Sequence, residues 1–213
     1  MKLYHYVHCP FCIRVRMGLG LLGVEHESIV LPYDDEATPL KLTGQKMLPI
    51  LEISNGNAIN ESLIILKTFD PKDIMNWSLL LKSSNEIDEL INKIGTPVHS
   101  LCMPYWIWTP EFDPNSRKYF QEKKEIKRGP FKILIQNKHI YLLELNNILA
   151  NEIEVNLSPF YKSSTLSIID IMIASHLWGM YIFPEFQFST TIHNYLQSIN
   201  NLTHFDYHQD FWR

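Results

Sequence analysis

The pattern of the chain changes abruptly at Pro71, and this change limits the possible folds more than any other feature. Before Pro71, strand signals alternate with helix signals, and after it only helical periods follow. The strand signals are four short runs, at Lys2–Val7, Glu25–Leu31, Ile50–Ile53 and Ala58–Ile59. Asn55-Gly56 between the last two runs indicates a tight hairpin, and Ser62–Phe69 is a short helix. We therefore expect an α/β domain followed by an all-α domain.

A helix is predicted over Cys12–Leu22, between the first two strands, although its apolar residues alternate as they would in a strand. Pro10 suits a first helical position, and Gly23 suits the end of a helix. The interior residues Gly18 and Gly20 would each cost about 1 kcal/mol relative to alanine. The flanking residues nevertheless favour a helix.

Two segments of the later part have the form of a capping box, which marks the start of a helix: Ser83–Glu86 and Ser167–Asp170. Apolar residues behind the first box fall on one helical face, and Pro97 predicts a kink there. The helix after the second box, Ile168–Trp178, is apolar nearly all round, so we expect it to be the buried centre of the second domain. Gly129-Pro130 predicts a break between helices.

The order strand, helix, strand, hairpin, helix matches a thioredoxin-like domain over residues 1–71. Residues 72–82 are expected to be a linker, and residues 83–213 an all-helical C-terminal domain. The formal net charge of −4 does not favour nucleic acid as a partner. No apolar stretch is long enough to span a bilayer, and the N-terminus lacks the apolar core of a signal peptide. A cytoplasmic location without membrane contact is therefore the default expectation.

The three cysteines, Cys9, Cys12 and Cys102, are too few for a secreted disulfide framework. Cys9-Pro10-Phe11-Cys12 lies between a strand and a helix. Unpaired N–H groups and the helix dipole there stabilise a thiolate on Cys9. Cys12 lies one turn into the helix, where it can attack a mixed disulfide formed on Cys9. Cys102 has apolar neighbours and is expected to fill space.

The same C-x-x-C pattern also occurs as half of a zinc or iron–sulfur site. Such a site needs further soft ligands, and Cys102 is the only other cysteine of the sequence. No second C-x-x-C or H-x-x-x-H lies nearby in the sequence. The pattern therefore favours a redox pair without a metal, and a metal site stays as the alternative.

Two further segments bear on this choice. Pro49 in Met47-Leu48-Pro49-Ile50 opens a strand that otherwise looks buried, which is typical of an unpaired edge or a cis bond. Glu61-Ser62 stands at the start of a helix, where backbone amides and a Ser hydroxyl can receive a carboxylate and Glu61 can hold an ammonium. An edge proline and an ordinary helix cap are the alternative interpretations.

Cys9-Pro10-Phe11-Cys12, Leu48-Pro49 and Glu61-Ser62, in this order, resemble the glutathione site of glutaredoxins and related transferases. The resemblance implies that Pro49 is cis and that the backbone of Leu48 pairs with the cysteinyl unit of glutathione. It also implies that Glu61 and Ser62 receive the γ-glutamyl end.

More narrowly, the chain resembles the bacterial glutaredoxin 2 family through four further segments: Met1-Lys2-Leu3-Tyr4, Arg16-Met17, Gly44-Gln45-Lys46 and Arg117-Lys118-Tyr119-Phe120. That family has a thioredoxin-fold domain followed by a helical, glutathione-transferase-like one. The chain departs from the family at His8, where an acidic residue is usual, and at Phe11, which replaces a tyrosine.

The resemblance implies a dithiol glutaredoxin, a glutathione-dependent thiol–disulfide oxidoreductase with glutathione as cosubstrate. Through Cys9 and Cys12 it would reduce protein disulfides and glutathione mixed disulfides, with glutathione reductase acting indirectly through glutathione. One alternative is a Cys-type glutathione transferase or dehydroascorbate reductase on the same architecture, and Cys12 argues against it because those reactions need one cysteine. The other is a non-catalytic or metal-binding module. The basic stretch Arg117–Arg128 is interpreted as a solvated helix face, or else as a docking surface or a wall of the active-site cleft.

Overall fold

The structure is a computed structural model that describes residues 1–54 and 56–206. Asn55 of the predicted hairpin and the last seven residues of the predicted C-terminal domain, 207–213, lie outside the described residues.

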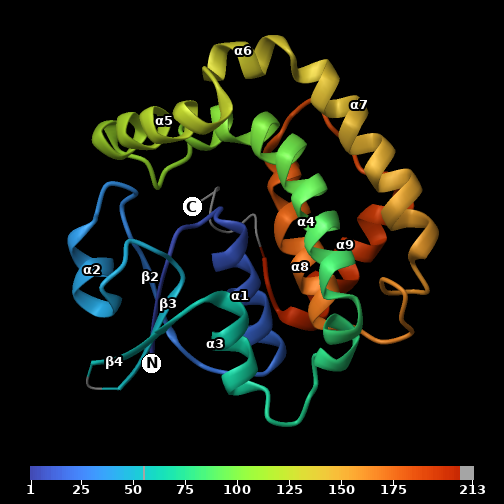
Figure 1. Cartoon of the computed structure of the whole chain (residues 1–213), viewed down its shortest axis with the longest axis horizontal. Coiled ribbons are helices and arrows are strands. Elements are labelled where there is room, and N and C mark those ends of the chain that lie inside the picture. The colour runs from blue at the N-terminus through green and yellow to red at the C-terminus, as the bar shows by residue number, and fades with distance from the viewer. Residues whose placement is uncertain (55, 207–213) are drawn as a thin grey trace.

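A sheet of four strands in the order β2-β1-β3-β4 organises the N-terminal half (Figure 1). The strands are β1 (Lys2–His5), β2 (Glu27–Val30), β3 (Ile50–Ser54) and β4 (Asn57–Asn60). β1 pairs parallel with β2 and antiparallel with β3, and β3 pairs antiparallel with β4. A parallel pair needs a crossover connection, and helix α1 (Pro10–Leu21) provides it between β1 and β2.

Helices cover both faces of this sheet (Figure 1). α1 packs with α3 (Ser62–Phe69) on the face toward the helical half, and α2 (Ala37–Thr43), which the sequence did not predict, contacts β3 and β4. The interior glycines of α1 allow close packing. A Cβ on Gly20 would lie 1.9 Å from the carbonyl oxygen of Thr203, and a Cβ on Gly18 would lie 2.4 Å from Leu66. Contact with other elements therefore explains residues that are unfavourable in an isolated helix.

The C-terminal half is helical. Its α-helices are α4 (Trp77–Trp106), α5 (Pro114–Arg128), α6 (Phe131–Gln136), α7 (Lys138–Ile148), α8 (Ile168–Leu177) and α9 (Thr190–Thr203). A π-helical turn (Leu149–Ile153) follows α7, and short 3₁₀ turns occupy Glu154–Asn156 and Trp178–Ile182. Every residue of α8 is buried, and α8 contacts α1, α4 and α9. The predicted buried centre is therefore confirmed.

The start of α4 differs from the sequence prediction. Residues 77–82, which the sequence suggested as linker, form its first turns. The buried carboxylate of Asp70 organises them, because it accepts hydrogen bonds from the N–H groups of Ile74 and Met75 and from the indole of Trp77. The boundaries of the two domains, residues 1–71 and 83–213, stay a prediction.

The first predicted capping box lies at a kink inside α4, where two helical stretches meet at Ser83. Ser83 has non-helical backbone angles inside α4 (φ −131°, ψ 22°), and its hydroxyl donates to the carbonyl of Leu79 at 2.8 Å. The backbone angles at Pro97, inside α4, are helical, and the kink expected there stays a prediction. Contacts of α4 with α6, α7 and α8 support this long helix on several sides.

One hydrophobic core runs through both halves. It joins Met17 and Leu19 of α1 to the buried residues of α4, α8 and α9. Cys102 is completely buried in this core, with its sulfur 3.4 Å from the carbonyl oxygen of Gly179, and burial raises the pKa of its thiol. The prediction that Cys102 fills space is consistent with this position. None of the described helices combines the length and the apolar character that crossing a membrane requires.

Candidate active site

Cys9 and Cys12 lie at the N-terminal end of α1. Cys9 is the residue before the first helical position, and its backbone is extended (φ −70°, ψ 121°). Its side chain is half-buried, whereas Cys12, one turn further, is fully buried. The backbone N–H of Tyr6 points at the Cys12 sulfur at 3.4 Å. Both cysteines are free thiols, so the structure represents the reduced pair.

The surroundings of the two thiols give them different acidities. A hydrogen bond from the Cys12 thiol lowers the pKa of Cys9 most, and burial acts in the opposite direction. The backbone N–H groups of Cys12 and Phe11 and the positive charge of Lys124 lower the pKa of Cys9 further. Burial raises the pKa of Cys12 well above the usual thiol value. The pair therefore consists of an accessible sulfur that favours the thiolate and a buried one that keeps its proton.

The four residues predicted to bind glutathione lie together beside this pair. Phe11 and Met47 complete the lining of a cavity of about 140 Å³, whose other walls are Leu48, Pro49, Glu61 and Ser62. The Leu48–Pro49 peptide bond is cis, as the resemblance implied. Glu61 stands immediately before α3 with φ 69°, a value rare outside glycine, and it is exposed.

A hydrogen bond from Arg14 orients the Ser62 hydroxyl so that its hydrogen can be donated to a ligand. The guanidinium Nη1 of Arg14 donates to Ser62 Oγ at 3.0 Å. Burial lowers the pKa of Arg14 to about 10, so the side chain is still a cation at neutral pH. Because Ser62 Oγ accepts this bond, its own hydrogen is available to a ligand. That hydroxyl and the first N–H groups of α3 can together hold a carboxylate.

The loop before α5 contacts the residues that lead into Cys9. Glu111 Oε2 accepts a hydrogen bond from the backbone N–H of Val7 at 2.9 Å. Its other oxygen lies 2.7 Å from Nδ1 of His8, and the His8 ring packs against Trp106 and Phe112. These contacts fix the backbone before Cys9 against the helical half. Nothing in the sequence around Glu111 indicated this role.

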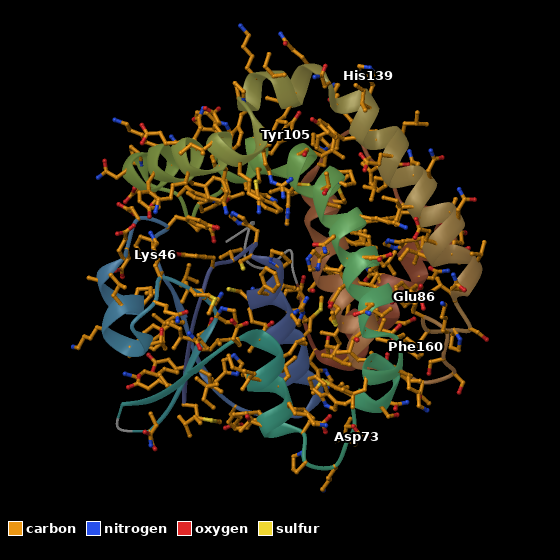
Figure 2. The ribbon with its side chains drawn as sticks, in the orientation of Figure 1. Lys46, Asp73, Glu86, Tyr105, His139 and Phe160 are labelled. Atoms are coloured by element: carbon orange, nitrogen blue, oxygen red, sulfur yellow. The ribbon has the colours of Figure 1, made fainter. Side chains whose placement is uncertain are left out.

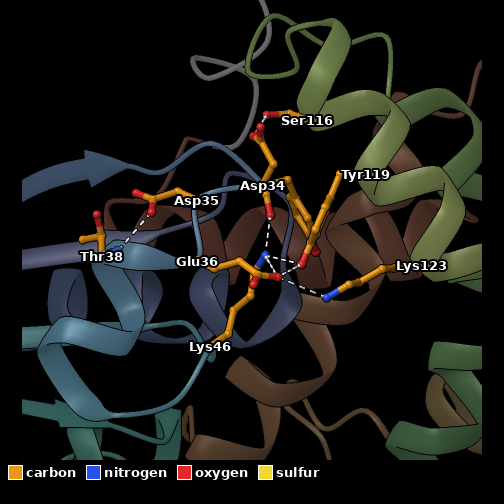
Figure 3. Close-up of polar contacts among 9 residues, drawn as sticks. Asp34, Asp35, Glu36, Thr38, Lys46, Ser116, Tyr119 and Lys123 are labelled. Atoms are coloured by element: carbon orange, nitrogen blue, oxygen red, sulfur yellow. Dashed lines mark hydrogen bonds and ion pairs between the residues drawn. The ribbon is translucent and has the colours of Figure 1, made fainter.

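A second set of polar contacts, separate from those of Glu111, joins the N-terminal half to α5. Figure 3 shows Glu36 and Lys46 of the N-terminal half meeting Tyr119 and Lys123 of α5. Lys46 and Lys123 each place their ammonium 3.3 Å from Glu36 Oε1, and the Tyr119 hydroxyl donates to the same carboxylate. These three donors lower the pKa of Glu36 to about 2. Figure 2 shows side chains of both halves extending into the space between α5 and the sheet.

The fold and the site agree with what comparison to other proteins shows. Residues 86–211 match the family described as "Glutaredoxin 2, C terminal domain", and residues 3–73 match "Glutathione S-transferase, N-terminal domain". Glutaredoxin 2 of Escherichia coli is 33% identical over 177 residues, which cover 81% of each chain. The chain belongs to the glutaredoxin 2 family.

Solved structures extend this result. The structure resembles glutaredoxin 2 of Salmonella typhimurium, solved in complex with glutathione, with a TM-score of 0.86 and 29% identity over 99% of this chain and 97% of the other. A glutathione transferase of Phanerochaete chrysosporium gives a TM-score of 0.77 at 13% identity, over 96% and 97% of the two chains, which shows the fold alone. The predicted fold class, a thioredoxin-like domain followed by a helical glutathione-transferase-like domain, is confirmed.

The basic residues of the stretch Arg117–Arg128 have two kinds of surroundings. Lys118 is exposed, and within the part of the chain that the structure describes its one ion pair is with Glu122 of its own helix, as the prediction of a solvated face requires. Lys124 instead lies over the rings of Tyr33 and Phe120, at 5.9 and 5.4 Å from their centroids. The alternative interpretation, a wall of the cleft, therefore describes part of the stretch. Within residues 1–54 and 56–206, no group of three or more His, Cys, Asp or Glu side chains is placed to hold a metal.

Proposed function

We propose that this protein is a dithiol glutaredoxin, which uses glutathione as cosubstrate to reduce protein disulfides and glutathione mixed disulfides. Cys9 is the nucleophile and leaving group, and Cys12 resolves mixed disulfides formed on Cys9. Glutathione reductase acts indirectly, by regenerating glutathione. We infer a cytoplasmic location and no metal, in keeping with reversible thiol chemistry.

The different acidities of the two thiols are the observation that carries this proposal. A lowered pKa raises the thiolate fraction of Cys9 and also makes Cys9 a better leaving group when a second thiol attacks its mixed disulfide. The Cys12 thiol donates its hydrogen bond to Cys9, so it is close enough to attack once it loses its proton.

Binding of glutathione follows from the cavity beside the dithiol. The γ-glutamyl carboxylate fits the N-terminus of α3 and the hydroxyl of Ser62, and Glu61 receives the ammonium. The backbone of Leu48, which precedes the cis proline Pro49, pairs with the cysteinyl unit. The Salmonella typhimurium relative, whose structure contains glutathione, supports this assignment.

The test is turnover of a small glutathione mixed disulfide by the purified protein, coupled to glutathione reductase and NADPH. Cys9→Ser should abolish this turnover. Cys12→Ser should keep it, because a second glutathione can resolve the intermediate, and should lose most reduction of protein disulfides. A Cys12→Ser protein that equals the wild type in both assays would identify a single-cysteine transferase or dehydroascorbate reductase instead. Inactivity of the wild type in both would leave the non-catalytic module.

A further inference from the structure

Arg14 is a buried cation whose charge is poorly balanced. The residue is 3% exposed, and within residues 1–54 and 56–206 no ion pair joins its guanidinium to an acidic side chain. The charges of Cys9 and Asp88 raise the pKa of Arg14, but burial outweighs them. Its Nε is buried and has no hydrogen-bond acceptor among the described residues. Such a cation is costly in the protein alone, which indicates that an anionic ligand completes its surroundings.

Arg14 contacts two residues of the cavity that Glu61 and Ser62 line. Its Nη1 donates to Ser62 Oγ at 3.0 Å, and its Cζ lies 5.1 Å from the centroid of the Phe11 ring. Both Phe11 and Ser62 belong to the wall of that cavity, whereas Arg14 does not line it. The positive charge of Arg14 therefore acts on a ligand in the cavity from behind Ser62.

The start of α3 has donors that suit a carboxylate. No side chain caps this helix, so its first backbone N–H groups lack a side-chain acceptor. The Ser62 hydroxyl accepts from Arg14, and its own hydrogen is therefore directed to another acceptor. Glu61, immediately before Ser62, is exposed, and its carboxylate alone would repel an anion. Glu61 and Arg14 together provide one negative and one positive charge, which match the ammonium and the carboxylate of a γ-glutamyl end.

We propose that Arg14 determines the specificity of this site for the α-carboxylate of the γ-glutamyl end, through its charge and through the orientation of the Ser62 hydroxyl. This inference rests on the proposed function and adds a residue to it. Arg14 is a positioning residue, because it acts on the ligand through Ser62. The consequence is selectivity: a disulfide whose γ-glutamyl end has lost its α-carboxylate is a poor substrate, even when the rest of the molecule is identical.

The experiment compares two symmetric disulfides that differ only in this carboxylate. One is glutathione disulfide, and the other is the disulfide of 4-aminobutyryl-cysteinylglycine, which keeps the amino group. In the Cys12→Ser protein, the Cys9 thiolate attacks one sulfur of either compound and a Cys9–S bond forms. The S–S bond of the compound breaks, and its second half leaves as a thiolate that takes a proton from water. Mass spectrometry gives the second-order rate constant for each disulfide, and the ratio of the two constants measures selectivity.

Three variants of Arg14 separate its charge from its volume. Arg14→Gln removes the charge, and Arg14→Lys keeps it. Arg14→Met answers the same question as Arg14→Gln if circular dichroism shows that the glutamine variant does not fold, because an apolar side chain needs no partner in a buried site. The matched control is Arg16→Gln, the same change on the same helix, where Arg16 lies over the Phe205 ring at 4.7 Å. Because the charges of Arg14 and Cys9 interact, both rate constants can change, and their ratio removes that effect.

With Arg14 in place, the protein should prefer glutathione disulfide by about tenfold, as expected for one hydrogen-bonded charge interaction. Arg14→Gln and Arg14→Met should lower this ratio by about three- to tenfold, whereas Arg14→Lys should keep most of it and Arg16→Gln all of it. A ratio near one with Arg14 present, or an unchanged ratio in the neutral variants, would overturn this inference while the attack itself proceeds. If Cys9 attacked neither disulfide with Arg14 present, the proposed function itself would be wrong.

Discussion

Asp170→Ala should destabilise the protein by about 3–5 kcal/mol, although Asp170 is remote from the cysteines. The Asp170 side chain is 0% exposed and its carboxylate accepts four hydrogen bonds. The donors are the N–H and hydroxyl of Ser167, the N–H of Tyr161 and the hydroxyl of Tyr195, at 2.8 to 2.9 Å. Removal of the carboxylate leaves these donors buried without a partner.

The magnitude follows from the count of donors. A hydrogen bond to a charged group contributes about 1.5–3 kcal/mol, but the sum over four bonds overstates the loss because the donors partly relax. The structure gives different costs for Asp170→Ala and Ser167→Ala, although both residues belong to the same capping box. In Ser167→Ala the backbone N–H of residue 167 keeps its bond to Asp170, so only the hydroxyl is lost, at about 1 kcal/mol.

Urea unfolding followed by tryptophan fluorescence and circular dichroism measures both free energies, and coincident transitions test the two-state assumption. Turnover per folded molecule should be unchanged in both variants. If the two variants lost the same free energy within about 0.5 kcal/mol, a margin set by the extrapolation, the argument from buried donors would fail.

Three further outcomes are expected. Because its pKa is lowered, Cys9 should reach half its maximal rate of alkylation by iodoacetamide below the ordinary thiol value of about 8.5, while Cys12 stays unmodified there; a Cys9 midpoint at or above that pH would contradict this. Glu61→Ala should raise KM for glutathione more than it lowers kcat, since its contact is the same in the ground and transition states, and an unchanged KM would place the γ-glutamyl end elsewhere. Gly20→Ala should cost about 1–3 kcal/mol in urea unfolding because its Cβ would lie 1.9 Å from a backbone carbonyl, whereas Gly95→Ala, with neighbours at 3.7 Å, should gain up to about 1 kcal/mol.

The sequence was sufficient to predict those parts of the site whose geometry depends only on residues adjacent in the chain. Pro10 sets the start of α1, so the position of Cys9 at a helix N-terminus follows from four consecutive residues. Leu48-Pro49 and Glu61-Ser62 are dipeptides whose roles depend on their own backbone, and they were found in the same way. The secondary-structure prediction failed at residues 77–82, because the helix there begins at Trp77, which is held by the buried carboxylate of Asp70, and the sequence pattern did not show that this carboxylate is buried.

The contributions of the helical half had no comparable signal. Glu111 stands in a loop between prolines and acts on Val7 and His8, which only the assembled fold brings near. Lys124 looks like its neighbours Lys123 and Lys127 in the sequence, yet only the direction of its side chain, over Tyr33, makes its charge act on Cys9. Helical periodicity identifies which residues share a face, but not which other element that face meets.

The N-terminal half therefore provides most of the groups that act on the thiols, but its stability depends on contacts with the helical half. The backbone of α1 and the cysteines themselves provide most of the thiolate chemistry, so a thioredoxin-like domain supplies it by local means. The same helix packs its opposite side against α8 and α9, closely enough that a Cβ on Gly20 would clash with the backbone at the end of α9. Without the helical half, the core residues Met17 and Leu19 of that side would lose part of their cover, which a small domain tolerates poorly. Stability of the reactive helix thus depends on α8 and α9, while the charge of Lys124 on α5 lowers the pKa of Cys9.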